Sequence, residues 1–271
     1  MRSKTPYILL IIVLILVIIG LVGWYFLARP KTPVPASPTS TTTAPVANSL
    51  PITDVAPLHI TDSGTYYTAD LEYPPTTPLA QSVGASADAA AVATMKAYDE
   101  NAIATFKKDS DIADITPQAA QDEGLNSYNK YSLTSTYKVY TSPTSVSYVF
   151  TISEDTLGAH PNSSFQTFTF RAKDGVSISL ANLFDSGTNY LSSLSILSRT
   201  ALTKQLGSGS SPSFIDPGTT ADANNFSNFA IDGSNLLIFI PPYAVEPYSS
   251  GSQTVSIPLT QLSNVLQAAY Q

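Results

Sequence analysis

The chain has 271 residues, no cysteine and a formal net charge of −7 at pH 7. The lack of cysteine excludes disulfides, thiolate catalysis and cysteine-based zinc sites. All 20 acidic residues follow residue 53, whereas four of the 13 basic residues lie before residue 32, so residues 52–271 carry a net charge of −11. Because such an acidic surface repels nucleic acid, we expect no nucleic-acid partner.

Residues 7–27 form an apolar run, YILLIIVLILVIIGLVGWYFL, without charge or proline. A helix rises about 1.5 Å per residue, so this run can cross a hydrocarbon core of about 30 Å. The run is longer than a signal-peptide core and no clear cleavage site follows it, which predicts an uncleaved signal-anchor in the cell membrane. Arg2 and Lys4 favour a cytoplasmic tail of residues 1–6 and an extracytoplasmic C-terminal part.

Residues 28–51 are rich in proline, threonine and serine and contain few large apolar side chains. This composition cannot bury a core and predicts an extended, semi-rigid stalk. We expect the folded part to begin near residue 52.

The first half of the folded part predicts one strand and one long helix. Residues 66–73 alternate between apolar and polar side chains, as in a half-buried strand. Residues 86–108 place apolar side chains on one helical stripe, with Ser86 or Asp88 as the N-cap. The polar residues 109–129 predict a loop or a short helix.

From residue 130 the pattern changes to strands. Residues 131–140 and 145–153 predict a hairpin, and the turn-rich residues 158–164 predict a loop. Residues 165–172 predict a strand that the Asp174-Gly175 turn joins to a further strand over residues 176–180.

The last third mixes helices and strands. Helices are predicted over residues 190–206, with Gly207 as the C-cap, and over residues 260–270. Strands are predicted over residues 236–240, which are continuously apolar as in a strand covered on both sides, and over residues 254–257.

Strands and helices are segregated along the chain, which predicts an α+β fold with a mainly antiparallel sheet and a few packed helices after the single transmembrane helix. We divide it into an N-terminal part, residues 52–144, and a C-terminal domain, residues 145–271.

Three segments occur in the order and spacing typical of a known family of domains. They are LGAHPN at residues 157–162, KDGVSISLANLF at residues 173–184, and FIPPYAVEPYSSGSQTVSIP at residues 239–258. Together they resemble the extracytoplasmic domain of the lysozyme-sensing anti-sigma factor (RsiV-like), which also accompanies some peptidoglycan deacetylases. The resemblance covers most of residues 52–271 and implies an α+β module that binds a ligand at the cell surface without catalysis of its own.

The chain departs from that family in two ways. Leu157 stands where the family motif GGAH has a glycine, and because leucine disfavours a positive φ, the loop is expected to differ there. The six residues before the apolar run are too few for a sigma-binding domain, so any signal is expected to leave through another protein or through loss of the anchor.

Few residues suggest common catalytic sites. The two histidines, His59 and His160, lie in different segments, and no HExxH or G-x-S-x-G motif is present. His59 is expected to form a solvated pair with Asp62, and His160 to bond local backbone in its loop. A triad of Ser, His and Asp stays open, because triads are spatial rather than sequential.

Adjacent carboxylates such as Asp99 and Glu100 are expected to be solvated, since neighbours on a helix point apart. Asp109, Asp111 and Asp114 resemble a calcium loop only loosely, because the glycine and the closing glutamate are missing. We therefore predict no metal site and no cofactor.

Tyrosine is abundant, with 15 residues against one tryptophan. Two tyrosines flank Glu246 and Pro247 behind a Pro-Pro pair, and rigid prolines that present tyrosine and a carboxylate suit the binding of a protein or glycan. The alternative is that Tyr243 packs and its hydroxyl caps a strand end. The ligand-binding candidates are Gly158, His160, Asn162, Tyr243, Glu246 and Tyr248.

These observations favour a membrane-anchored, extracytoplasmic bacterial binding module without catalysis of its own. Its expected partner is a cell-wall glycan or a basic, lysozyme-like wall-degrading protein. One alternative is a cell-wall hydrolase or deacetylase-like enzyme that uses His160 and a carboxylate. Another is a scaffold within an envelope assembly.

Overall fold

The structure is a computed structural model that describes residues 55–207 and 211–271. The predicted tail, signal-anchor and stalk lie outside the described residues. Within the described ranges, none of the helices is both long enough and apolar enough to span a membrane. The described residues all belong to one compact unit.

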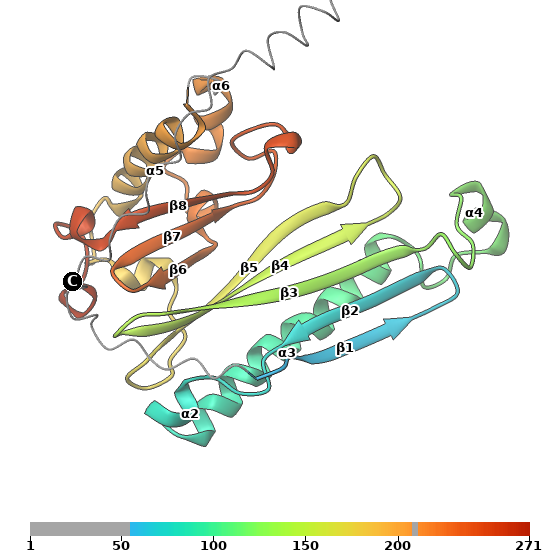
Figure 1. The fold of residues 1–271 in the computed structure, drawn as a ribbon, viewed down its shortest axis with the longest axis horizontal. Coiled ribbons are helices and arrows are strands. Elements are labelled where there is room, and N and C mark those ends of the chain that lie inside the picture. The colour runs from blue at the N-terminus through green and yellow to red at the C-terminus, as the bar shows by residue number, and fades with distance from the viewer. Residues whose placement is uncertain (1–54, 208–210) are drawn as a thin grey trace, which may run out of the picture. The chain divides into compact units, whose positions relative to one another are not determined.

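A long five-stranded sheet dominates this unit (Figure 1). Its strands follow chain order from one edge to the other: β1 (Leu58–Ser63), β2 (Tyr67–Tyr73), β3 (Tyr131–Thr141), β4 (Ser145–Asp155) and β5 (Asn162–Arg171). β2 and β3 run parallel and the other neighbours antiparallel, so the sheet is mixed. The predicted α+β fold with mainly antiparallel pairing is confirmed.

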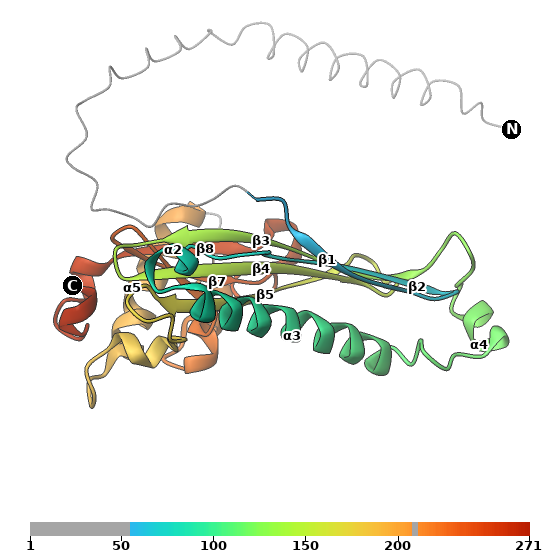
Figure 2. The same cartoon turned by 90° about the horizontal axis from the view of Figure 1, so that it is seen from below.

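One face of the long sheet is covered by helix α3 (Ala85–Asp109), as Figure 2 shows. The helix confirms the prediction over residues 86–108, but its N-cap is Gly84 instead of Ser86 or Asp88. The Asp88 carboxylate instead accepts hydrogen bonds from the Thr77 backbone N–H at 2.5 Å and the Thr76 hydroxyl at 3.0 Å, which fixes the preceding loop to the helix. The short helices α2 (Leu79–Ser82) and α4 (Pro117–Asp122) flank α3 in the chain.

A second, antiparallel sheet contains β6 (Phe229–Asp232), β7 (Asn235–Ile240) and β8 (Gln253–Pro258). Figure 1 shows it beside one end of the long strands, with α5 (Tyr190–Leu206) and α6 (Pro212–Ile215) near it. The predicted helix over residues 190–206 is confirmed, and Gly207 is its C-cap with φ 69°.

The side chains of β4 point alternately to the two faces of the long sheet, so this strand contributes to the packing on both faces. Val146, Tyr148 and Phe150 pack with Met95 of α3. Val149 points the other way and packs with Ala230, Leu237 and Phe239 of the second sheet. The first six residues of β4 are therefore all buried, whichever way they point.

β7 confirms the prediction of a strand covered on both sides. Leu236, Ile238 and Ile240 belong to the apolar cluster that also contains Leu194 and Leu202 of α5. Its intervening side chains join the cluster around Val149. The second sheet thus lies between α5 and the long sheet.

Two predicted elements are wrong. Residues 260–270 form two 3-10 turns, η6 (Leu259–Leu262) and η7 (Ala268–Tyr270), instead of a helix. Between them Leu266 bridges to Phe184 and the Gln267 N–H bonds the Leu183 carbonyl at 2.9 Å, and this pairing requires extended backbone.

The predicted strand over residues 176–180 is reduced to a single bridge between Phe170 and Ser177, after which the chain enters the 3-10 turn η1 (Leu180–Leu183). The strands β1 and β6 were not predicted from the sequence. β6 is only four residues long and β1 is largely exposed, so neither has a strong apolar pattern.

Candidate functional site

The two loops proposed from the sequence meet in space although they are far apart in the chain. One follows β4 and leads into β5, and the other joins β7 to β8. The Nε2 atom of His160 lies 2.9 Å from the hydroxyl oxygen of Tyr243, across a sequence separation of 83 residues. The packing of the second sheet on the first therefore brings three of the six candidates together.

His160 is held by hydrogen bonds and by stacking. Its Nδ1 lies 3.1 Å from the Pro161 carbonyl, which can only accept, so Nδ1 carries the proton. In the tautomer with its only proton on Nδ1, Nε2 accepts from the Tyr243 hydroxyl. The ring stacks on Tyr248, with the centroids 3.4 Å apart and the planes 11° from parallel.

The Pro161 carbonyl is the shared acceptor of the site. Besides His160 Nδ1–H, it accepts a hydrogen bond from the Tyr248 hydroxyl at 3.1 Å. A carbonyl oxygen has two lone pairs, and both are used here. Sequence reasoning missed this role, because a backbone oxygen leaves no signal in the residue pattern.

Among the rings of His160, Tyr243 and Tyr248, that of Tyr243 is the most accessible, with 65% of the residue's surface exposed. Its centroid lies 5.8 Å from that of His160 and 5.5 Å from that of Tyr248. The alternative prediction, that Tyr243 packs while its hydroxyl caps a strand end, is wrong, since the ring is exposed and the hydroxyl bonds a histidine. We name the three residues His160, Tyr243 and Tyr248 the ring cluster.

Backbone strain accompanies the ring cluster. Tyr243 has φ 70° and Leu157 has φ 60°, a conformation that costs a residue with a Cβ about 1–2 kcal/mol. The loop thus takes, with leucine, a backbone conformation that a glycine would favour. The Asp155 carboxylate stabilises the turn by accepting from the Leu157 N–H at 2.8 Å.

The other three candidates lie outside the ring cluster's hydrogen bonds. Gly158 and Asn162 are exposed, and Asn162 pairs with Glu154 at the start of β5. Glu246 is half-buried, and its Oε1 is buried without a hydrogen-bond partner among the described residues.

A cleft of about 1090 Å³ lies elsewhere, between the end of α3, the start of β3 and α4. Lys108, Asp109, Glu123 and Tyr131 are among the residues that line it. The hydroxyl of Tyr131 donates to the Glu123 carboxylate. Burial and this neighbour raise the pKa of Tyr131 to about 12. None of the six candidates lines this cleft.

His59 and Asp62, which were expected to pair with each other, have other partners. His59 pairs with Asp70 at 2.7 Å and not with Asp62, because β1 and β2 pair antiparallel; the hydrogen bond to Asp70 raises the pKa of His59. Asp62 pairs with Lys107 of α3 at 2.8 Å, which lowers the pKa of Asp62. In the described ranges, no three His, Cys, Asp or Glu side chains are close enough to hold a metal ion.

Asp99 corrects the expectation that the carboxylates of residues 99 and 100 are both solvated. Glu100 is exposed and pairs with Lys96, but Asp99 is fully buried on the inner side of α3. Burial raises the pKa of the Asp99 carboxyl to about 7. The expectation failed because adjacent residues of a helix point apart, and here one of them points at the sheet.

Part of the C-terminal half of this fold matches a known family. Residues 181–260 match the family described as "Protein of unknown function (DUF3298)". The DUF3298 match contains all of the β7–β8 loop, whereas the loop with His160 precedes it. It is compatible with the resemblance to the RsiV-like extracytoplasmic domain.

Two solved structures from the DUF3298 family share the fold. The one from Bacteroides fragilis has a TM-score of 0.52 at 17% identity and covers 79% of this chain and 93% of that chain. The one from Pseudomonas aeruginosa has a TM-score of 0.51 at 12% identity and covers 80% of this chain and 97% of that chain.

A curated relative is similar over part of its length. The chain is 26% identical over 113 residues to the peptidoglycan-N-acetylmuramic acid deacetylase PdaC of Bacillus subtilis. The match covers 42% of this chain but only 24% of that protein. The chain therefore spans about a quarter of the relative that it matches.

Proposed function

We propose that residues 52–271 form a binding module for cell-wall glycan, which residues 7–27 anchor at the outer face of a bacterial cell membrane. In this proposal the module binds its ligand without catalysing a reaction. The ring cluster carries the proposal. Exposed tyrosine presents an apolar face and a polar edge, a combination that suits the alternating apolar and hydroxyl surfaces of a sugar ring.

The neighbours of His160 support binding more than hydrolysis. A hydrolytic histidine is typically oriented by a carboxylate and bonds a serine hydroxyl or a water that it activates. In the described part of the chain, Nδ1 bonds a carbonyl and Nε2 bonds the Tyr243 hydroxyl, so both nitrogens serve to hold the cluster. The similarity to a protein named as a peptidoglycan deacetylase supports a location near cell-wall glycan.

Charge favours a second candidate ligand, a basic, lysozyme-like protein. Residues 52–271 carry a net charge of −11, and opposite charge increases association rates at low salt. Such binding would weaken steeply between low and high salt, whereas stacking of sugars on tyrosine would change little. Salt dependence therefore distinguishes the two ligands.

Sedimentation with insoluble peptidoglycan and capture on immobilised lysozyme test the proposal. We expect the wild-type chain to bind peptidoglycan, and Tyr243→Ala to lose about tenfold or more in affinity, the loss typical of an aromatic hot spot. Tyr128→Ala is the matched control, because Tyr128 is 98% exposed and belongs to another loop. Absence of binding to both peptidoglycan and lysozyme would overturn the proposal.

A further inference from the structure

Gly218 contacts the backbone of the loop that presents Tyr243. A Cβ atom built on Gly218 would lie 2.1 Å from the Ala244 carbonyl oxygen and 2.6 Å from Val245 Cγ1. Real Cβ atoms essentially never approach other atoms so closely. Gly218 is not among the glycines with positive φ, so glycine is needed here for space and not for backbone conformation.

The contacted residues are directly linked to the ring cluster. Ala244 follows Tyr243, and the buried Val245 anchors the loop in the apolar cluster between the second sheet and α5. Tyr243 has little freedom to absorb a shift, because its backbone already occupies the sparsely populated region at φ 70°. A displacement at Ala244 therefore changes where the Tyr243 hydroxyl lies relative to His160.

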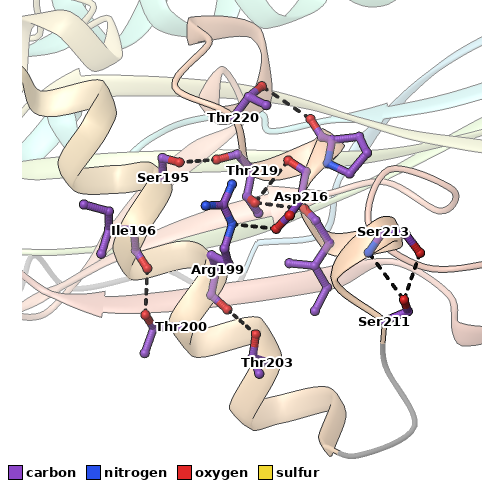
Figure 3. A network of polar contacts seen from close by, with 12 residues as sticks. Ser195, Ile196, Arg199, Thr200, Thr203, Ser211, Ser213, Asp216, Thr219 and Thr220 are labelled. Atoms are coloured by element: carbon purple, nitrogen blue, oxygen red, sulfur yellow. Dashed lines mark hydrogen bonds and ion pairs between the residues drawn. The ribbon is translucent and has the colours of Figure 1, made fainter.

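Gly218 lies in the 3-10 turn η3 (Pro217–Thr219), and a hydrogen bond and an ion pair hold the two flanks of this turn (Figure 3). On one side the Ser195 hydroxyl of α5 donates to the Thr219 carbonyl at 2.5 Å. On the other side Arg199 Nε of α5 lies 2.8 Å from Asp216 Oδ1. The turn is therefore fixed relative to α5, so a Cβ at Gly218 would push the loop more readily than the turn.

Further bonds inside the turn add rigidity. The Thr219 side chain is fully buried, and its hydroxyl donates to the Ile215 carbonyl at 2.8 Å. The Asn225 amide donates to the Pro217 and Thr220 carbonyls, at 3.3 and 3.2 Å. Because Gly218 and Thr219 are buried and these bonds tie the turn on both sides, we expect it to move as one body with the helix that holds it.

We infer that η3 is the positioning element of the ring cluster, and that Gly218 is a positioning residue that sets the separation of Tyr243 and His160. The consequence for ligand binding rests on the proposed function. The consequence for the geometry of the cluster does not, so the two can be tested separately.

The geometric test uses the two histidines of the full-length chain in detergent micelles. In a chain with isotope-labelled histidine, the ring protons of His160 report the stacked Tyr248 and the neighbouring Tyr243, whereas His59 serves as an internal reference. We expect Gly218→Ala to shift the His160 resonance and to leave that of His59 in place. An unchanged His160 resonance in folded Gly218→Ala would overturn the inference, and so would equal shifts at both histidines.

Gly187→Ala controls for general destabilisation. Gly187 has φ 80° and nothing within 4 Å of a built Cβ, so alanine strains its backbone without pushing on another segment. We expect no shift of the His160 resonance in this variant. A shift as large as that of Gly218→Ala would show that loss of stability alone disturbs the cluster, against the inference.

Ser195→Ala provides a second route if Gly218→Ala does not fold. It removes the bond to the Thr219 carbonyl from outside the loop, and we expect a smaller shift at His160. An unchanged His160 resonance would contradict the positioning role. If the wild type binds peptidoglycan, Gly218→Ala should weaken binding about tenfold, the size of loss that follows from a loosened site. If the wild type does not bind, the proposed function fails while the resonance test still decides the inference.

Discussion

The two faces of the long sheet bury polar groups in opposite ways. Toward the second sheet, the outward N–H groups of β6 all meet oxygens of the long sheet: Phe229 N–H bonds the Thr167 hydroxyl at 3.2 Å, and Ile231 N–H the Ser147 hydroxyl at 3.3 Å. Gly233 N–H bonds the Thr141 carbonyl at 2.9 Å. Toward α3, the buried oxygens of Asp99 and Ser135 have no hydrogen-bond partner among the described residues.

Asp99 and Ser135 occupy corresponding places on facing elements. Asp99 lies midway between Met95 and Ile103, which belong to two separate apolar clusters. On β3, Ser135 likewise lies between Leu133 of one cluster and Tyr137, which packs on the other. The polar groups therefore sit at the junction of two cores.

The polar groups on the two faces therefore have different effects on the fold. The Thr167 and Ser147 hydroxyls bond N–H groups on the outer edge of β6, which would otherwise be buried without an acceptor, and only one docking position of the second sheet allows these bonds. The groups under α3 satisfy nothing within the described chain, and an unsatisfied buried carboxyl opposes folding when it is charged. The face toward the second sheet therefore specifies how that sheet docks, whereas the face toward α3 makes the stability of the fold depend on pH.

The largest expected effect is a loss of stability with rising pH that depends on Asp99. The folded state raises the pKa of this carboxyl from 3.8 to about 7, so it binds more protons than the unfolded state between these values. The free energy of unfolding should therefore fall as pH rises from about 4 to about 7, by at most about 4 kcal/mol. Urea unfolding at several pH values measures this.

Asp99→Asn is the control, because the amide resembles the protonated carboxyl and does not titrate. We expect it to match the wild type near pH 4 and to be more stable than the wild type by about 2 kcal/mol or more at pH 8. Parallel pH profiles of the two proteins would show that Asp99 is solvated, and the contrast between the two faces would disappear.

Ser147→Ala should have the next largest effect, because it leaves the Ile231 N–H buried without an acceptor and also removes the acceptor of the Thr169 hydroxyl, which donates at 3.0 Å. We expect a loss of about 1–3 kcal/mol in the free energy of unfolding. Chemical unfolding monitored by tyrosine fluorescence and by circular dichroism measures it. A neutral result would mean that another acceptor replaces the hydroxyl.

Ser135→Ala is the matched change on the other face. Both serines are buried in neighbouring strands, but Ser135 Oγ has no partner in the described chain, so its removal leaves no other group unsatisfied. We expect stability to change by less than about 1 kcal/mol or to increase. A loss as large as that of Ser147→Ala would indicate that Ser135 bonds a buried water or Asp99.

The smallest effect is expected at the exposed pair of His59 and Asp70, with which the buried polar groups of both faces can be compared. In Asp70→Asn, the pKa of His59 should fall back toward its ordinary value, because the hydrogen bond to Asp70 is the main cause of its elevation. NMR titration of the His59 ring measures this. An unchanged His59 pKa would show that solvent fully screens this pair.

Sequence periodicity predicted the elements that carry a strong local pattern. The stripe of α3, the strand alternation of β2 to β5 and the Gly207 end of α5 follow from side-chain spacing and from the conformational freedom of glycine. The same reasoning could have found β6 from the Asp232-Gly233 turn before the apolar β7, since Asp-Gly between strand-like runs indicates a hairpin. The choice of His160, Tyr243 and Tyr248 as candidates also came from the sequence.

Only the tertiary structure decided how those candidates meet. Their contact depends on the packing of β6 onto the face of β4 and β5, which brings together loops from two different sheets, and no local pattern encodes such a distance. The same holds for Asp99, whose apolar surroundings come from another element, and for Gly218, whose need for space arises from a loop that follows it in the chain. Local spacing determines which way a side chain points, whereas burial and contact depend on what the rest of the chain places opposite it.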